Sequence, residues 1–151
     1  MSAKVIVLLF NDKRGALSAA AQLRWLKDEG DADFTLHAGV VVAKDARGKL
    51  SLLRQKARPA LGVGIGALCG ALLGLIGGPV GVAVGAGTGA VVGLSSDVIR
   101  SELDDDFVAG IMRDLKPGNA AIIMEALEGS VTTIDNIVAE HHGRVTRQDV
   151  F

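Results

Sequence analysis

The sequence has little cysteine, little aromatic character and little net charge. Of its 151 residues one is cysteine and 3% are aromatic, none of them tyrosine, and the formal net charge is −1. The single cysteine, Cys69, excludes an internal disulfide and a cysteine metal cluster, and we expect it to be a small apolar packing residue. Near-neutral charge with few aromatic rings also argues against base stacking and phosphate binding, so we expect no nucleic-acid partner.

Charge is also missing from one long segment, residues 59–96, which holds 12 of the 20 glycines. These glycines recur every four residues in two runs, and residues four apart share one face of a helix. Each run therefore predicts a flat helix face that another backbone can approach closely. The first run is Gly62, Gly66, Gly70, Gly74 and Gly78, and the second is Gly77, Gly81, Gly85, Gly89 and Gly93.

The two runs predict a helical hairpin. Each half would be ~27–30 Å long, close to the hydrocarbon thickness of a bilayer, and Gly77-Gly78-Pro79 between them is a turn signal. Glycine costs about 1 kcal/mol per residue in a helix in water, whereas a bilayer enforces helices and favours close packing of small faces. We therefore expect a glycine zipper in or on a membrane, with both ends on the same side. A buried packing element in a water-soluble homo-oligomer is the alternative.

Basic residues precede this segment. The last three, Arg54, Lys56 and Arg58, are the predicted membrane-surface cations, since Lys and Arg beside an apolar span favour the cytoplasmic face and attract anionic headgroups. The alternative is a solvated strand face. The whole basic stretch also includes Lys44, Arg47 and Lys49.

Outside the glycine segment, hydrophobic periodicity predicts an α+β domain. We expect strands at residues 4–10, 33–45, 49–55, 119–127 and 144–150, and helices at about 13–29, from 104–106 to 115, and from a cap at Ser130 to a stop at Gly143. The first six elements then form a ferredoxin-like βαββαβ unit, followed by one further helix and strand. Residues 1–58 and 97–151 would be this domain, and residues 59–96 the inserted hairpin.

The polar residues predict no catalytic or metal site. His141 and His142 are adjacent and diverge on a helix, so we expect them to complement the helix dipole rather than bind metal. The carboxylates of residues 104–106 are expected to open a helix. We find no nucleophile–base pair, no nucleotide fingerprint and no cofactor site, and predict a protein that is not an enzyme.

Four stretches carry a resemblance to a known family: KVIVLLF, the glycine segment, DDDFVAGIMRDLKPGNAAIIM and HHGRVTRQDV. They cover nearly the whole chain, which resembles a bacterial family of predicted membrane proteins of unknown function with general-stress-protein relatives. The resemblance implies a ferredoxin-like cytoplasmic domain carrying a membrane-interacting hairpin. It implies no catalytic residues.

The expected function is self-assembly at the cytoplasmic membrane, with the α/β domain on the cytoplasmic side. The partners would be copies of the same chain and the lipid membrane. Two alternatives stay open: a water-soluble cytoplasmic homo-oligomer, and a sensor that binds a small ligand through the ferredoxin-like domain. Fold analogy alone supports the sensor.

Overall fold

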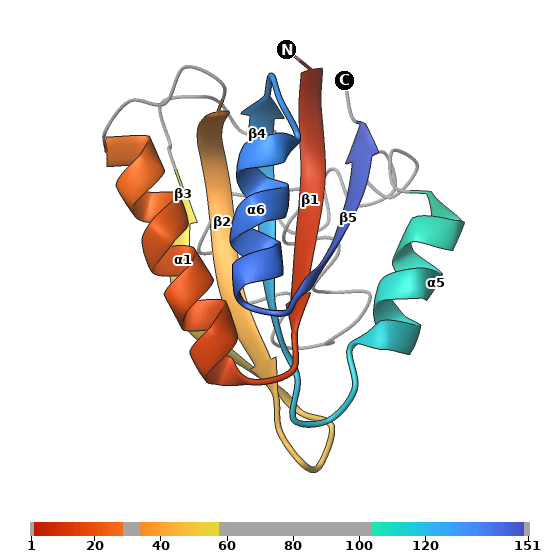
Figure 1. The fold of residues 1–151 in the computed structure, drawn as a ribbon. Helices are drawn as coiled ribbons and strands as arrows, with labels where there is room; N and C mark the ends of the chain where they lie inside the picture. Colours follow the sequence, from red (N-terminus) through yellow and green to blue (C-terminus); the bar gives the residue numbers. More distant parts are fainter. Residues whose placement is uncertain (1, 29–33, 58–103, 150–151) are drawn as a thin grey trace.

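The computed structural model describes residues 2–28, 34–57 and 104–149, which form five strands and three helices (Figure 1). They confirm the type and order of the elements predicted there, with bounds that differ by a few residues. The hairpin predicted at residues 59–96 lies outside the described residues. The elements are β1 (Ser2–Phe10), α1 (Lys13–Asp28), β2 (Phe34–Lys44), β3 (Leu50–Ala57), α5 (Asp105–Asp114), β4 (Ala120–Glu128), α6 (Thr132–Glu140) and β5 (Arg144–Asp149).

The strands form one five-stranded sheet in the order β3-β2-β4-β1-β5, with antiparallel pairing throughout. The described part is thus a mixed α/β structure. A ferredoxin-like unit built from the first six elements would need β3 between β1 and β2. Instead, β4 occupies that place, and β3 lies at the edge of the described sheet, where β2 is its one partner among the described strands.

Both faces of the sheet are buried. Helices α1 and α6 cover one face (Figure 1), and Ile6, Leu8 and Phe10 of β1 point into the core between them. The alternate residues of β1, Val5, Val7 and Leu9, are also buried, although they lie on the opposite face. Burial on both faces explains why β1 reads as a continuous apolar run rather than as an alternating pattern.

Helix α5 lies next to β5 at the edge of the sheet (Figure 1). Asp104 caps its first turn, because the carboxylate accepts a hydrogen bond from the Asp106 backbone N–H at 3.1 Å. At the other end, the Lys44 ammonium donates to the Leu115 carbonyl at 3.2 Å. A cation at the C-terminus of a helix satisfies a free carbonyl and complements the dipole. Both ends of α5 are therefore capped by side chains.

Helix α6 ends differently from the prediction. The left-handed residue after the helix is His142, with φ 56°, and not Gly143. Its N–H and that of Gly143 bond back to the carbonyls of Ala139 and Val138, as in a Schellman motif. At the N-terminus the capping position is Val131 rather than the predicted Ser130, whose hydroxyl accepts a hydrogen bond from the Thr132 N–H.

Replacing His142 with glycine is expected to stabilise the protein. Glycine adopts the left-handed conformation without the steric cost that a side chain incurs, although it loses more entropy on folding. The net gain in the free energy of unfolding should be about 0.5–1 kcal/mol, measured by urea denaturation. His142→Ala is the control, since alanine removes the imidazole and keeps the strain. A control as stable as His142→Gly would show that the imidazole, not the backbone, sets the cost.

Candidate functional site: the end of the sheet where the glycine segment joins

The predicted site residues lie mostly beyond the described part of the chain. The ten zipper glycines and Arg58 lie outside the described residues. Arg54 and Lys56 belong to strand β3, where they stand opposite Val41 and Gly39 of β2 in the register.

The chain enters and leaves residues 58–103 at the same end of the sheet. Strand β3 runs parallel to β4, since both are antiparallel to β2, so Ala57 and Glu128 end their strands in the same direction. The chain resumes at Asp104, whose backbone N–H donates to Gln148 Oε1 at 2.7 Å, near the end of β5. We call this end, marked by Ala57, Asp104, Glu128 and the end of β5, the attachment end; it is uppermost in Figure 1.

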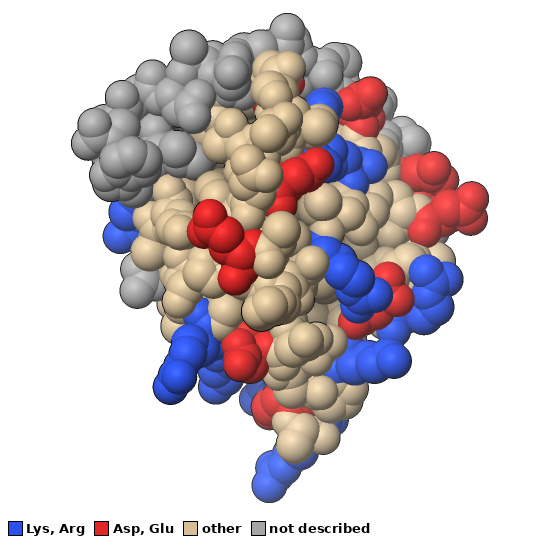
Figure 2. Space-filling model, in the orientation of Figure 1, with Lys and Arg blue, Asp and Glu red and all other residues tan. Residues whose placement is uncertain are grey.

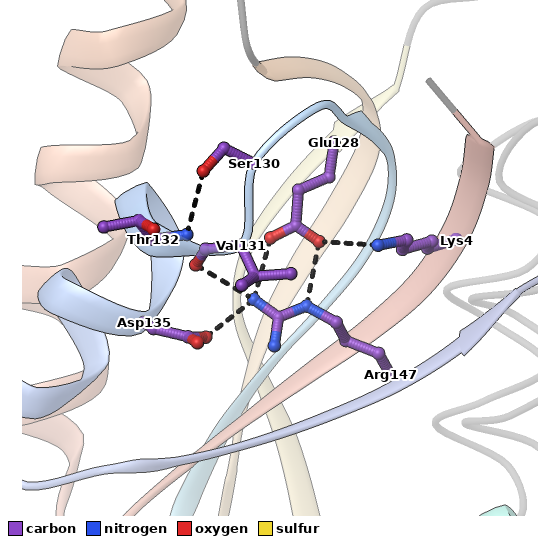
Figure 3. A network of polar contacts seen from close by, with 7 residues as sticks. All are labelled: Lys4, Glu128, Ser130, Val131, Thr132, Asp135 and Arg147. Carbon is purple, nitrogen blue, oxygen red and sulfur yellow. Dashed lines mark hydrogen bonds and ion pairs between the residues drawn. The ribbon is translucent and has the colours of Figure 1, made fainter.

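A buried carboxylate organises the attachment end. Glu128, the last residue of β4, accepts two hydrogen bonds from the Arg147 guanidinium, at 2.8 Å from Nε and 2.7 Å from Nη2 (Figure 3). Lys4 Nζ on β1 lies 3.3 Å from Glu128 Oε2. Arg147 Nη2 also lies 2.7 Å from Asp135 of α6 and 3.4 Å from the Val131 carbonyl. We call Lys4, Glu128, Asp135 and Arg147 the charged network.

The charged network is strong because water hardly reaches its centre. The Glu128 side chain is 1% exposed, against 15% for Lys4 and 20% for Arg147. A bidentate arginine–carboxylate pair gains strength from both charge and geometry. The hydrogen bond to Glu128 raises the pKa of Arg147 above its ordinary value, and the bond to Asp135 adds to the rise, although burial acts in the opposite direction. Arg147 therefore stays cationic throughout the physiological range.

The charged network joins four elements of the fold. Its members come from β1, β4, β5 and α6, so it fixes three adjacent strands to the first turn of a helix. Every buried side-chain nitrogen and oxygen in the described part has a hydrogen-bond partner. Within residues 2–28, 34–57 and 104–149, no three His, Cys, Asp or Glu side chains are grouped so that they could hold a metal ion.

Two further sequence predictions concern membrane-spanning helices and the histidines at the end of α6. None of the helices in residues 2–28, 34–57 and 104–149 is long and apolar enough to cross a membrane. At the end of α6, His141 Nε2 lies 3.1 Å from Gln22 Oε1, and the Gln22 amide donates to Glu140 at 3.1 Å. These contacts join α6 to α1.

Sequence reasoning missed the charged network. Lys4 and Glu128 are 124 residues apart, so no local pattern pairs them. One signal was present: β4 reads AAIIMEALE, and a carboxylate in so apolar a strand needs a partner. The short polar strand β5 contains the arginine, Arg147, that pairs with this carboxylate.

Three other cations of the basic stretch before the glycine segment lie at the far end of the sheet. Lys44 ends β2 and Lys49 precedes β3, so both lie at the end of the sheet opposite the attachment end. Arg47 lies in the turn between these strands. Lys44, Arg47 and Lys49 are close in sequence to Arg54 and Lys56. Strand β3 nevertheless separates them in space, because it runs from this turn toward the attachment end.

The comparisons with known proteins give a family and no function. No curated protein and no solved structure matches the chain. The sequence profile of a family described as "Protein of unknown function (DUF1269)" matches residues 59–150, more than half of the chain. The match spans the glycine segment and continues through α5, β4, α6 and all of β5. The chain therefore belongs to the DUF1269 family of proteins of unknown function.

Proposed function

We propose that this protein is a non-enzymatic, membrane-associated protein that assembles with copies of itself through the glycine-zipper hairpin at residues 59–96. The observation that carries the proposal is the shared position of the two junctions. A hairpin must return to where it started, and the chain leaves after Ala57 and resumes at Asp104 at the same end of the sheet. The uncharged, glycine-periodic sequence between them suits close helix packing in lipid. The resemblance to general-stress proteins suggests a stress response as its setting.

The described domain would then be a ferredoxin-like platform, built from other elements than those expected. We propose that it consists of β1, α1, β2, β4, α6 and β5, which follow the βαββαβ order. Their strands are neighbours in the order β2-β4-β1-β5. In this view β3, residues 58–103 and α5 form one long insertion between β2 and β4. Insertions at a loop are well tolerated. The charged network would stabilise the ferredoxin-like domain close to the point where this insertion is attached.

Substitutions on the two predicted glycine faces test whether the chain assembles through them. Gly70→Leu and Gly85→Leu place a bulky side chain on each face, so both variants should dissociate into smaller species because the backbones can no longer approach. The measurement is the molar mass in detergent by size-exclusion chromatography with light scattering. Ala71→Leu and Ala86→Leu are matched controls, one residue away and on another helix face, and should keep the native mass.

Three results would count against the proposal. An unchanged mass in both glycine variants would contradict the zipper. Equal loss of mass in the alanine controls would point to general disruption of the segment rather than to its glycine faces. Extraction of the native protein from membranes by alkaline carbonate, without detergent, would contradict insertion and favour the water-soluble assembly.

A further inference from the structure

Cations gather at the end of the sheet opposite the attachment end. Four separate stretches meet there. Strand β2 ends at Lys44, whose N–H and carbonyl bond to Asn119 and Gly118 and so hold the α5–β4 loop against it. Strand β5 begins at Arg144, opposite Leu9 near the end of β1. We call this surface, made of residues 11–14, 44–49, 113–119 and Arg144, the basic end. Figure 2 shows Lys and Arg side chains around it, at the lower end of the view.

The acidic residues of the basic end do not neutralise most of its cations. The Asp12 carboxylate accepts the Gly15 N–H at 2.8 Å, and that of Asp45 accepts the backbone N–H groups of Arg47 and Lys49, both at 2.9 Å. Only Asp114 forms ion pairs there, with Arg113 and Arg144. The exposed cations that form no ion pair with a described residue are Lys13, Arg14, Arg47, Lys49 and Lys116.

The charge of the basic end contrasts with that of the chain. It carries eight Lys and Arg against three Asp, a formal charge of +5, and since the whole chain carries −1, the remainder carries −6. Charge separated in this way orients a molecule in an electric field and steers its approach to an anionic partner. The attachment end exposes Asp104, Asp106 and Asp149, so it does not suit the same partner.

The shape and chemistry of the basic end fit a plane of phosphates best. The turn between β2 and β3 projects beyond the other loops (Figure 1), so the surface is convex. A protein partner would call for a cluster of apolar or aromatic anchors, yet the exposed large hydrophobics of the described part are Met112, directly before Arg113 on α5, and Val131, next to the charged network at the attachment end. A single exposed methionine beside the basic end makes no apolar cluster. A single-stranded nucleic acid would call for stacking rings, and the described phenylalanines are all buried.

We propose that the basic end docks on an anionic lipid surface. This inference does not rest on insertion of the glycine segment. If the segment is inserted, the basic end lies about 30 Å from the attachment end, which is the length of a nine-residue strand, and points away from that bilayer. The lipid that it binds then belongs to a second membrane surface. Each Lys or Arg near an anionic membrane strengthens binding about fivefold.

The experiment uses the full-length chain held in phosphatidylcholine nanodiscs, so that residues 59–96 already have a lipid environment. The nanodiscs are mixed with vesicles that contain phosphatidylglycerol or with vesicles of phosphatidylcholine alone, and binding is measured by co-flotation. We expect binding to the anionic vesicles alone, weakened by added salt because exposed charges are screened. Arg47→Gln with Lys49→Gln should weaken it about 25-fold. These changes leave the turn intact, since Asp45 holds it through backbone N–H groups.

A matched control separates the basic end from total charge. Arg24→Gln on α1 removes an exposed cation elsewhere and should leave binding unchanged, whereas Arg47→Gln alone should weaken it about fivefold. Equal effects of Arg24→Gln and Arg47→Gln would overturn the proposal, as would equal binding by the double variant and the native chain. Stronger binding to a DNA oligonucleotide than to anionic vesicles at equal phosphate concentration would overturn it in favour of a nucleic-acid partner. A chain that carbonate extracts from membranes but that still binds anionic vesicles through Arg47 and Lys49 would contradict the proposed function and leave this inference standing.

Discussion

Arg147→Ala is expected to lower the free energy of unfolding by about 3 kcal/mol, because it leaves the Glu128 carboxylate buried with Lys4 as its one remaining ionic partner among the described residues. Removing one partner of a buried ion pair costs about 3–5 kcal/mol, since the other charge stays desolvated. We expect the lower end of that range because the guanidinium is 20% exposed, so water can enter when it is removed. Urea denaturation followed by circular dichroism measures the loss.

Two further variants separate charge from geometry in the charged network. Arg147→Lys keeps the charge but loses the bidentate contact and the reach to Asp135, so its loss should fall between zero and that of alanine. Replacing Lys4, Glu128 and Arg147 together by methionine, leucine and methionine should cost less than Arg147→Ala, since apolar replacement of a whole buried network is often nearly neutral. If the triple variant were the least stable of the three, the network would contribute net stabilisation and our reasoning from desolvation would be wrong.

Gly143→Ala is expected to destabilise the protein by about 2–3 kcal/mol, the upper part of the usual cost of overpacking. A Cβ added there would lie 2.7 Å from Phe10 Cε1 and 2.9 Å from the Leu9 carbonyl oxygen. Neither neighbour can give way easily, since Phe10 is buried in the core and the Leu9 oxygen belongs to the backbone of β1. Thermal or urea unfolding of the purified variant checks the value.

Gly110→Ala is the matched control for Gly143→Ala. Gly110 lies inside helix α5, and the side chain that an added Cβ would meet there is the flexible end of Arg113, at 3.7 Å. Alanine favours a helix over glycine by about 1 kcal/mol, so this substitution should stabilise the protein. Two Gly→Ala changes in one chain should thus have opposite signs. A loss of less than about 0.5 kcal/mol at Gly143 would show that β1 and the α6–β5 connection relax freely, contrary to the close approach described.

The secondary structure could be predicted from the sequence because its signals are local. Strand β1 contains a run of six apolar residues from Val5 to Phe10, and α5 opens at Asp104 with a capping carboxylate, as the cluster of aspartates suggested. Asp12 likewise caps α1. The end of α6 was misjudged because glycine usually takes the left-handed position after a helix. Here the close approach of β1 requires glycine at residue 143, so His142 takes that conformation.

The sheet order could not be predicted from element order, because β3 and β4 both compete for the place between β1 and β2. Composition held the answer in part. Strand β4 is apolar almost throughout, as a central strand requires, whereas β3 carries Arg54, Gln55 and Lys56 in succession, as an edge strand allows. The charged network and the basic end were beyond prediction, since each joins residues from distant parts of the chain. The zipper glycines remain a prediction from the sequence.

Burial of both faces of β1 has a consequence for how the strands find their alignment. In a sheet with one wet face, sliding a strand by one residue exposes apolar side chains, and this penalty selects the correct register. Between Val5 and Leu9, β1 lacks this penalty, because its side chains are buried on both faces of the sheet. The register must then be determined at the two ends of the strand, where Lys4 and Arg147 both contact Glu128, and where Phe10 lies against Gly143. These two contacts fix the register of β1 at its two ends, and a chain that lacks both should fold into a mixture of registers.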